Sequence, residues 1–162
     1  NKTMGVALAD FDNDGDLDLL LAHANAAPQL WRNTAVEDGL GGWLKVRLQG
    51  TEGGSNSHGI GCIVEVHLED GTILKQHAYA GDGFLGSSDP SVHFGLGEQS
   101  IVEVKVKWST GYIQSVGDVQ VDSEITIIEV LPPEPIDFSM LILILMTLIL
   151  VQLIWKSPQQ SQ

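Results

Sequence analysis

The sequence predicts a mainly β protein that ends in one apolar helix, and three observations lead to this fold class. Residues 43–130 contain six segments in which apolar and polar residues alternate, separated by Gly, Asp, Ser and Pro. An aspartate-rich stretch, DFDNDGDLDLLL at 10–21, precedes them, and residues 138–155 carry no charged side chain. Because alternation with period two buries one face of a strand, residues 43–130 are predicted to form a small antiparallel β-sandwich or barrel.

Composition limits the classes of function. The 162 residues are 43% hydrophobic, which is enough for a sizeable core, and carry a formal net charge of −13, which disfavours nucleic acid as a partner. Cys62 is the single cysteine, so an internal disulfide is excluded and the thiol is predicted to be a small core residue. The chain begins at Asn1 without an initiator Met or a signal segment. We therefore expect a C-terminal piece of a longer protein.

The aspartate-rich stretch predicts a calcium loop. Hard cations take six to eight oxygen ligands, which a tight loop supplies when carboxylates alternate and Gly allows a sharp turn. Gly15 is the turn residue in this interpretation. The alternating carboxylates are those of Asp10, Asp12, Asp14 and Asp18. An EF-hand is excluded because Leu21 stands where that loop needs a bidentate Glu.

The residues after the loop predict two short strands, in LDLLLAHA and PQLWRN, and then a linker. Leu17, Leu19 and Leu21 are expected to be buried on one face of the first strand and Leu20 on the other. The sequence AVEDGLGG at 35–42 is small, acidic and rich in Gly, and is interpreted as a linker or long turn.

The core of the β domain is predicted from its apolar runs. In IVEVKVKWS, the side chains of Val102, Val104, Val106 and Trp108 are expected to share one face. The complete set of predicted core residues is Val46, Ile63, Val66, Val104, Val106, Trp108 and Ile127.

The C-terminal region predicts a single membrane span. PPEP lies in a stalk at 131–137, and the helix at 138–155 is apolar all round, whereas a buried core helix normally shows a polar stripe. A removable lipid-anchor signal is disfavoured because Lys156 and six further residues follow. Lys156 favours a cytoplasmic tail at 156–162, and the sequon at Asn1 agrees with an extracellular β domain.

Two parts of the chain resemble known families. DFDNDGDLDLLLAHANAAPQLWRN is similar to the calcium-loop repeat of FG-GAP/VCBS β-propellers of the integrin-α type. GIGCIVEVHLEDG, GDGFLGSSDPSVHFGLG and VEVKVKWSTGYIQSV resemble the ASPIC/UnbV domain, which follows such repeats in the cartilage acidic protein family. The resemblance implies a partial propeller blade at the N-terminus, and it adds the backbone carbonyl of Asp16 to the four side-chain ligands of Ca²⁺.

The resemblance implies a non-enzymatic extracellular binding or adhesion protein with an unidentified protein or glycan ligand. A metal-dependent hydrolase that uses the aspartate loop remains an alternative, and so does a passive stalk domain. The expected parts are a partial FG-GAP/VCBS repeat at 1–34, a linker at 35–42, an ASPIC/UnbV-like β domain at 43–130, a stalk at 131–137, a transmembrane helix at 138–155 and a tail at 156–162.

Overall fold

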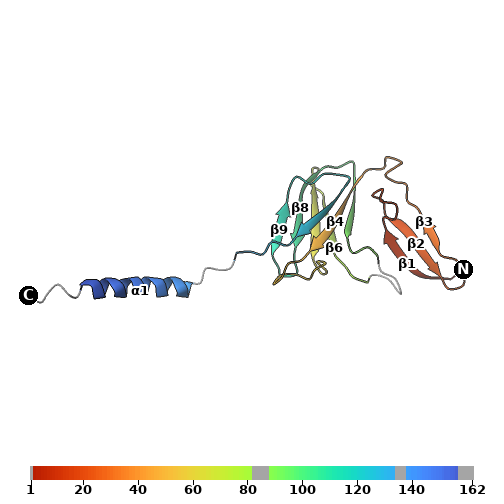
Figure 1. The fold of residues 1–162 in the computed structure, drawn as a ribbon. Helices are drawn as coiled ribbons and strands as arrows, with labels where there is room; N and C mark the ends of the chain where they lie inside the picture. The colour runs from red at the N-terminus through yellow and green to blue at the C-terminus, as the bar shows by residue number, and fades with distance from the viewer. Residues whose placement is uncertain (1, 82–87, 134–137, 157–162) are drawn as a thin grey trace, which may run out of the picture. The chain divides into compact units, whose positions relative to one another are not determined.

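A computed structural model describes residues 2–81, 88–133 and 138–156, and within them the chain is mainly β with one helix (Figure 1). The chain divides into two compact units, Asn1–Leu131 and Pro132–Gln162. The predicted fold class is confirmed, although the described strands do not close into a barrel.

The first unit begins with a three-stranded antiparallel meander, which we call the N-terminal sheet. Its strands are β1 (Thr3–Ala9), β2 (Asp18–His23) and β3 (Gln29–Trp31), in that order across the sheet. Leu17, Leu19 and Leu21 are only half-buried, and Leu20 is 44% exposed. These leucines are therefore less buried than predicted. In the described part of the chain, the two faces of the N-terminal sheet are not both covered by other strands.

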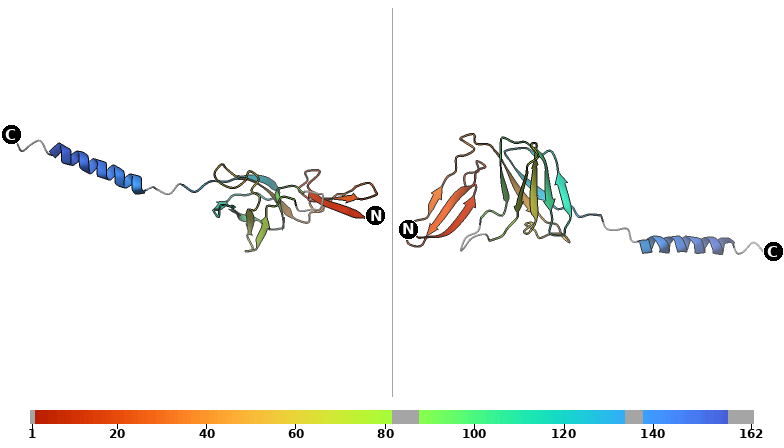
Figure 2. Two further views of the ribbon diagram at one scale, coloured as in Figure 1. Left: turned by 90° about the horizontal axis from the view of Figure 1, so that it is seen from below. Right: turned by 180° about the vertical axis from the view of Figure 1, so that it is seen from behind.

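The remaining strands form a two-layer sandwich, which we call the β domain (Figure 2). One layer has the order β10-β4-β7 and the other has the order β6-β5-β8-β9. The strands are β4 (Gly42–Gln49), β5 (Ile63–Leu68), β6 (Ile73–His77), β7 (Val92–Gly97), β8 (Ile101–Lys107), β9 (Ile113–Val116) and β10 (Ser123–Ile128). Most pairs are antiparallel as predicted, but β10 pairs with β4 in parallel.

The core lies between the two layers, where side chains of both sheets meet. Val46, Val66, Val104, Val106, Trp108 and Ile127 are buried as predicted, and so is Cys62. Ile63 is an error in the predicted core. It is half-buried because its neighbours Cys62 and Val64 take the inward positions of β5, and alternate residues of a strand face opposite ways.

Val102 does not share the buried face of Val104, Val106 and Trp108 as predicted, and a β-bulge explains the difference. Leu68 pairs with Ile101 and His67 pairs with Glu103, so Val102 is the extra residue between two consecutive pairs. The irregularity leaves Val102 55% exposed, while Ile101 packs against the core in its place.

The second unit contains the helix α1 (Phe138–Lys156), which runs without a break in all views (Figures 1 and 2). Residues Phe138–Trp155 have a mean hydropathy of 2.5, and none of this stretch is buried inside the structure. By length and composition α1 can cross a membrane once.

Candidate metal centre

The aspartate loop connects β1 to β2 and reverses the chain within a few residues. Two of its residues adopt the left-handed backbone conformation, Asn13 with φ of 61° and Gly15 with φ of 97°. Asn tolerates this region better than most residues and Gly adopts it freely, so the sequence DNDG forms the turn with little strain. The turn brings residues from both ends of the loop together.

Three of the predicted ligands converge. Asp10, Asp12 and Asp18 each place one carboxylate oxygen within 4.8 Å of the others. Oδ1 of Asp10 is buried and makes no hydrogen bond among the described residues. A buried carboxylate oxygen normally has a partner, and three converging carboxylates suit a hard cation. The residues present therefore fit Ca²⁺.

Asp18 is the buried member of the cluster. It is 2% exposed, and each of its two oxygens accepts a backbone hydrogen bond. Oδ2 accepts the N–H of Phe11 at 2.9 Å, and Oδ1 accepts the N–H of Asn33 at 2.8 Å. A carboxylate oxygen has two lone pairs, so each can accept such a bond and still face a cation.

Asp14 and Asp16 lie outside the converging group. Oδ1 of Asp14 accepts the N–H of Asp16 at 2.9 Å, which closes the turn. The side chain of Asp16 is buried and accepts the N–H of Val36 at 2.8 Å, so it anchors the segment that leads into the β domain. This use of the side chain leaves the backbone carbonyl of Asp16 as the predicted ligand.

Arg32 enters the cluster from the residue after β3, and the interpretation of the sequence missed it. Its guanidinium contacts Asp12, Asp14 and Glu37. Hydrogen bonds to Glu37 and Asp12 raise the pKa of Arg32, and the Asp16 N–H, followed by Arg32, lowers the pKa of Asp14. Arg32 is the one Lys or Arg between Lys2 and Lys45 in the sequence, and this isolation was the signal that could have pointed to it. Part of the loop's negative charge is thus balanced from within the chain.

The loop also packs against the β domain at Gly15. The Gly15 carbonyl lies 2.7 Å from Nε2 of His93, and the ring of His93 stacks on Trp43 at 6.3 Å. A Cβ at Gly15 would lie 2.0 Å from the Trp43 ring, so only Gly fits. Gly15 is therefore both the turn residue and the contact surface.

The fold and the loop together define a class of β protein, in which a three-stranded sheet with an aspartate-rich loop is followed by a two-layer β domain. The ASPIC and UnbV family profile matches residues 50–131, which are 82 of the 162 residues. The chain belongs to the ASPIC and UnbV family.

The chain is also similar to cartilage acidic protein 1 of three vertebrates. Identity is 32% over 126 residues with the Xenopus tropicalis protein, covering 76% of this chain and 19% of the relative. It is 30% over 136 residues with the Mus musculus protein (82% and 20%) and 31% over 112 residues with the Homo sapiens protein (68% and 16%). The chain spans at most a fifth of the length of these relatives.

Proposed function

We propose that this chain is the calcium-binding, membrane-proximal part of a non-enzymatic extracellular binding or adhesion protein. The observation that carries the proposal is the convergence of Asp10, Asp12 and Asp18, together with the buried Oδ1 of Asp10, which has no hydrogen-bond partner among the described residues. The N-terminal sheet acts as a blade of the FG-GAP/VCBS type, and the β domain is the ASPIC/UnbV module. Helix α1 serves as the anchor, with the β domain outside the cell.

Calcium has a structural role in this proposal. Asp10, Asp12 and Asp18, whose carboxylate oxygens converge, hold the ion through their side chains. The proposed ligand set also includes the side chain of Asp14, which lies outside that group, and the carbonyl of Asp16. The bound cation replaces carboxylate repulsion by attraction, which fixes where β2 enters its sheet. Because Gly15 packs on Trp43 and contacts His93, an ordered loop also steadies the junction with the β domain.

Calorimetric titration of the full chain with CaCl₂ tests the metal site. We expect one site with a dissociation constant on the order of 10⁻⁴ to 10⁻³ M, the range of extracellular calcium modules. Asp12→Asn should weaken binding at least tenfold, or about 1.4 kcal/mol, since it removes a charged ligand. Asp38→Asn is the matched control, because Asp38 is exposed and its carboxylate bonds the Thr34 hydroxyl outside the loop. Absence of binding heat from folded wild type, or equal binding by Asp12→Asn, would contradict the assignment.

The hydrolase alternative makes a different prediction. A catalytic metal would give turnover of phosphoesters or glycosides that depends on Ca²⁺ or Mg²⁺ and disappears in Asp12→Asn. We expect no turnover by either protein. Metal-dependent turnover by the wild type alone would replace the binding-module proposal by an enzyme.

A further inference from the structure

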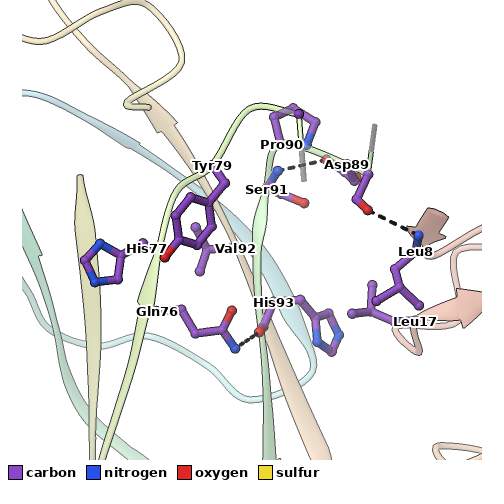
Figure 3. Close-up of a pocket in the computed structure, with 12 residues that line it drawn as sticks. Leu8, Leu17, Gln76, His77, Tyr79, Asp89, Pro90, Ser91, Val92 and His93 are labelled. Atoms are coloured by element: carbon purple, nitrogen blue, oxygen red, sulfur yellow. Dashed lines mark hydrogen bonds between the residues drawn. The ribbon is translucent and has the colours of Figure 1, made fainter. Parts of the chain in front are cut away.

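A pocket of about 310 Å³ lies where the N-terminal sheet meets the β6 and β7 edge of the β domain (Figure 3). All of its walls belong to the unit Asn1–Leu131. Leu8 of β1 and Leu17 of the aspartate loop form one apolar side, and the β domain supplies the described polar lining residues together with Tyr79, Pro90 and Val92. The residues used below are Leu8, Leu17, Gln76, Tyr79, Ser91 and His93.

Gln76 and Ser91 supply polar groups at fixed positions. Nε2 of Gln76 donates to the carbonyl of His93 at 2.8 Å and so bridges β6 and β7, which belong to different sheets. Because the amide nitrogen makes this bond, Oε1 is the end that can accept a hydrogen bond from a ligand hydroxyl. The N–H of Ser91 donates to Oδ1 of Asp89 at 2.9 Å, and the Ser91 hydroxyl also hydrogen-bonds the Asp89 carboxylate. The hydroxyl oxygen of Ser91 is therefore the acceptor that this residue offers at the pocket wall.

Tyr79 supplies an aromatic surface. Its side chain is 64% exposed, although an aromatic ring of this size normally contributes to a core. The ring stacks on His77 with centroids 5.6 Å apart and an interplanar angle of 25°, which restricts its rotation. Figure 3 shows Tyr79 and Gln76 on the same side of β7, with Leu17 on the other. An exposed ring held in place is suited to contact a ligand.

The charge around the described lining residues is balanced. Asp89 is the carboxylate among them, and the ammonium of the buried Lys45 lies 3.2 Å from it, with the guanidinium of Arg47 at 3.8 Å. Lys45 and Arg47 also pair with Glu124, and no Lys or Arg is among the described lining residues. Among these residues an anion therefore meets no unpaired Lys or Arg, and a cation meets a carboxylate that is already paired. The chemistry favours a neutral ligand with hydroxyl groups and one apolar face.

We infer that this pocket binds a neutral sugar residue of a glycan. The C–H face of the ring packs on Tyr79, and its hydroxyl groups bond Oε1 of Gln76 and the hydroxyl of Ser91, while Leu8 and Leu17 cover the remaining apolar edge. The volume is at the lower end of the roughly 300–1,000 Å³ of ligand pockets, which suits one or two sugar rings. The inference deepens the proposed binding function by naming a ligand class, and it does not require calcium.

Saturation-transfer NMR on the full chain in phosphatidylcholine nanodiscs tests the inference. The probes are methyl β-glucoside, methyl β-galactoside and N-acetylglucosamine, with glucuronate as the charged comparison. We expect transfer to at least one neutral sugar and a smaller signal for glucuronate. Tyr79→Ala should weaken binding about five- to tenfold, the loss expected for one aromatic contact. Tyr112→Ala is the matched control, because Tyr112 is a partly exposed Tyr that is not among the described lining residues.

Ser91→Ala gives a second variant, which should also weaken binding. It removes the hydroxyl, together with the hydrogen bond of that hydroxyl to Asp89, and keeps the N–H that donates to Asp89. Transfer to none of the neutral sugars, or equal transfer in wild type, Tyr79→Ala and Ser91→Ala, would overturn the inference, as would preferred binding of glucuronate. Calorimetry with CaCl₂ on the same sample separates the two proposals, because a failed calcium titration leaves the sugar result standing.

Discussion

At the scale of single residues, Glu129 shows how a buried charge is accommodated without a cation. It is 3% exposed, and its carboxylate accepts the Ser55 N–H at 2.6 Å and the hydroxyl groups of Ser55 and Thr110. Burial opposes ionisation, but these hydrogen bonds hold the pKa of Glu129 below its ordinary value. One side chain thus fastens the loop at Ser55 to the turn after β8.

Glu129→Gln should therefore lower the free energy of unfolding at pH 7 by about 1–3 kcal/mol, since a neutral amide cannot satisfy the same donors. Because the folded pKa is depressed, the contribution of Glu129 is present above the unfolded pKa of about 4.3 and is lost as pH falls through the folded value. Urea unfolding between pH 7 and 3 should show the two proteins converging at the acid end. Glu52→Gln, exposed in the same loop, should have little effect. A constant difference at every pH would contradict the role given to the charge.

The contact between Gly15 and Trp43 leads to a second prediction for a single residue. Gly15→Ala would place a methyl group inside the Trp43 ring volume, and it should cost about 1–3 kcal/mol through the shift this forces. Gly39→Ala is the matched control, because Gly39 also has a positive φ, of 68°, but open space around its Cβ position. Thermal denaturation measures the loss of stability in both variants. The difference between them separates the steric clash with Trp43 from the backbone strain that both share. Equal losses of stability would mean that Trp43 does not pack on the loop.

At the scale of elements, β8 shows how one bulge changes which side chains a strand buries. Its sequence alternates regularly, and Val104 and Val106 are buried in the core, but at the start of the strand Ile101 packs against the core while Val102 is exposed. The extra residue opposite β5 shifts the alternation at the start of the strand.

Val104→Asp should destabilise the β domain by roughly 3–5 kcal/mol, because it buries an unpaired charge at a position that is 0% exposed. Val102→Asp, two residues away on the same strand, should change stability by less than about 0.5 kcal/mol, as expected at an exposed site. Guanidinium unfolding measures both. A severe effect of Val102→Asp would show that the bulge is absent in solution.

At the scale of the whole molecule, α1 is the candidate membrane span. Its 19 residues extend about 28 Å at 1.5 Å per residue, close to the roughly 30 Å of a hydrocarbon core, so the helix should stand nearly upright. The hydroxyl of Thr147 donates to the Ile144 carbonyl at 2.7 Å, which satisfies one polar group inside the span. The apolar surface of α1 on all sides suits lipid contact.

We expect the chain, expressed behind a secretory signal, to resist carbonate extraction and to expose its β domain outside the cell. Protease added to intact cells should remove an epitope within residues 43–130 and spare one placed after Gln162. Permeabilised cells provide the control, in which both epitopes are removed. Release by carbonate would mean that α1 does not span the bilayer, and the reverse protection pattern would mean that the orientation is inverted.

Much of the molecule follows from local pattern. Period-two alternation predicted a mainly β fold and most of its core, because burial of one strand face requires that spacing whatever the partner strand. The uninterrupted apolar run predicted α1 for an equally local reason, since its length matches a bilayer core. The sequence by itself thus determined the strands, the helix and the place of the acidic loop.

Tertiary structure alone decided which residues meet. Arg32 contacts Asp12 and Asp14, which lie 20 and 18 positions away in the sequence. Ser55 bonds Glu129 across 74 positions, and β10 pairs in parallel with β4 from the far end of the domain. The same holds for the bulge that exposes Val102, because a register shift is a property of two strands. Periodicity states which way a side chain faces, but pairing energies between distant segments select its neighbours, and no single segment contains that information.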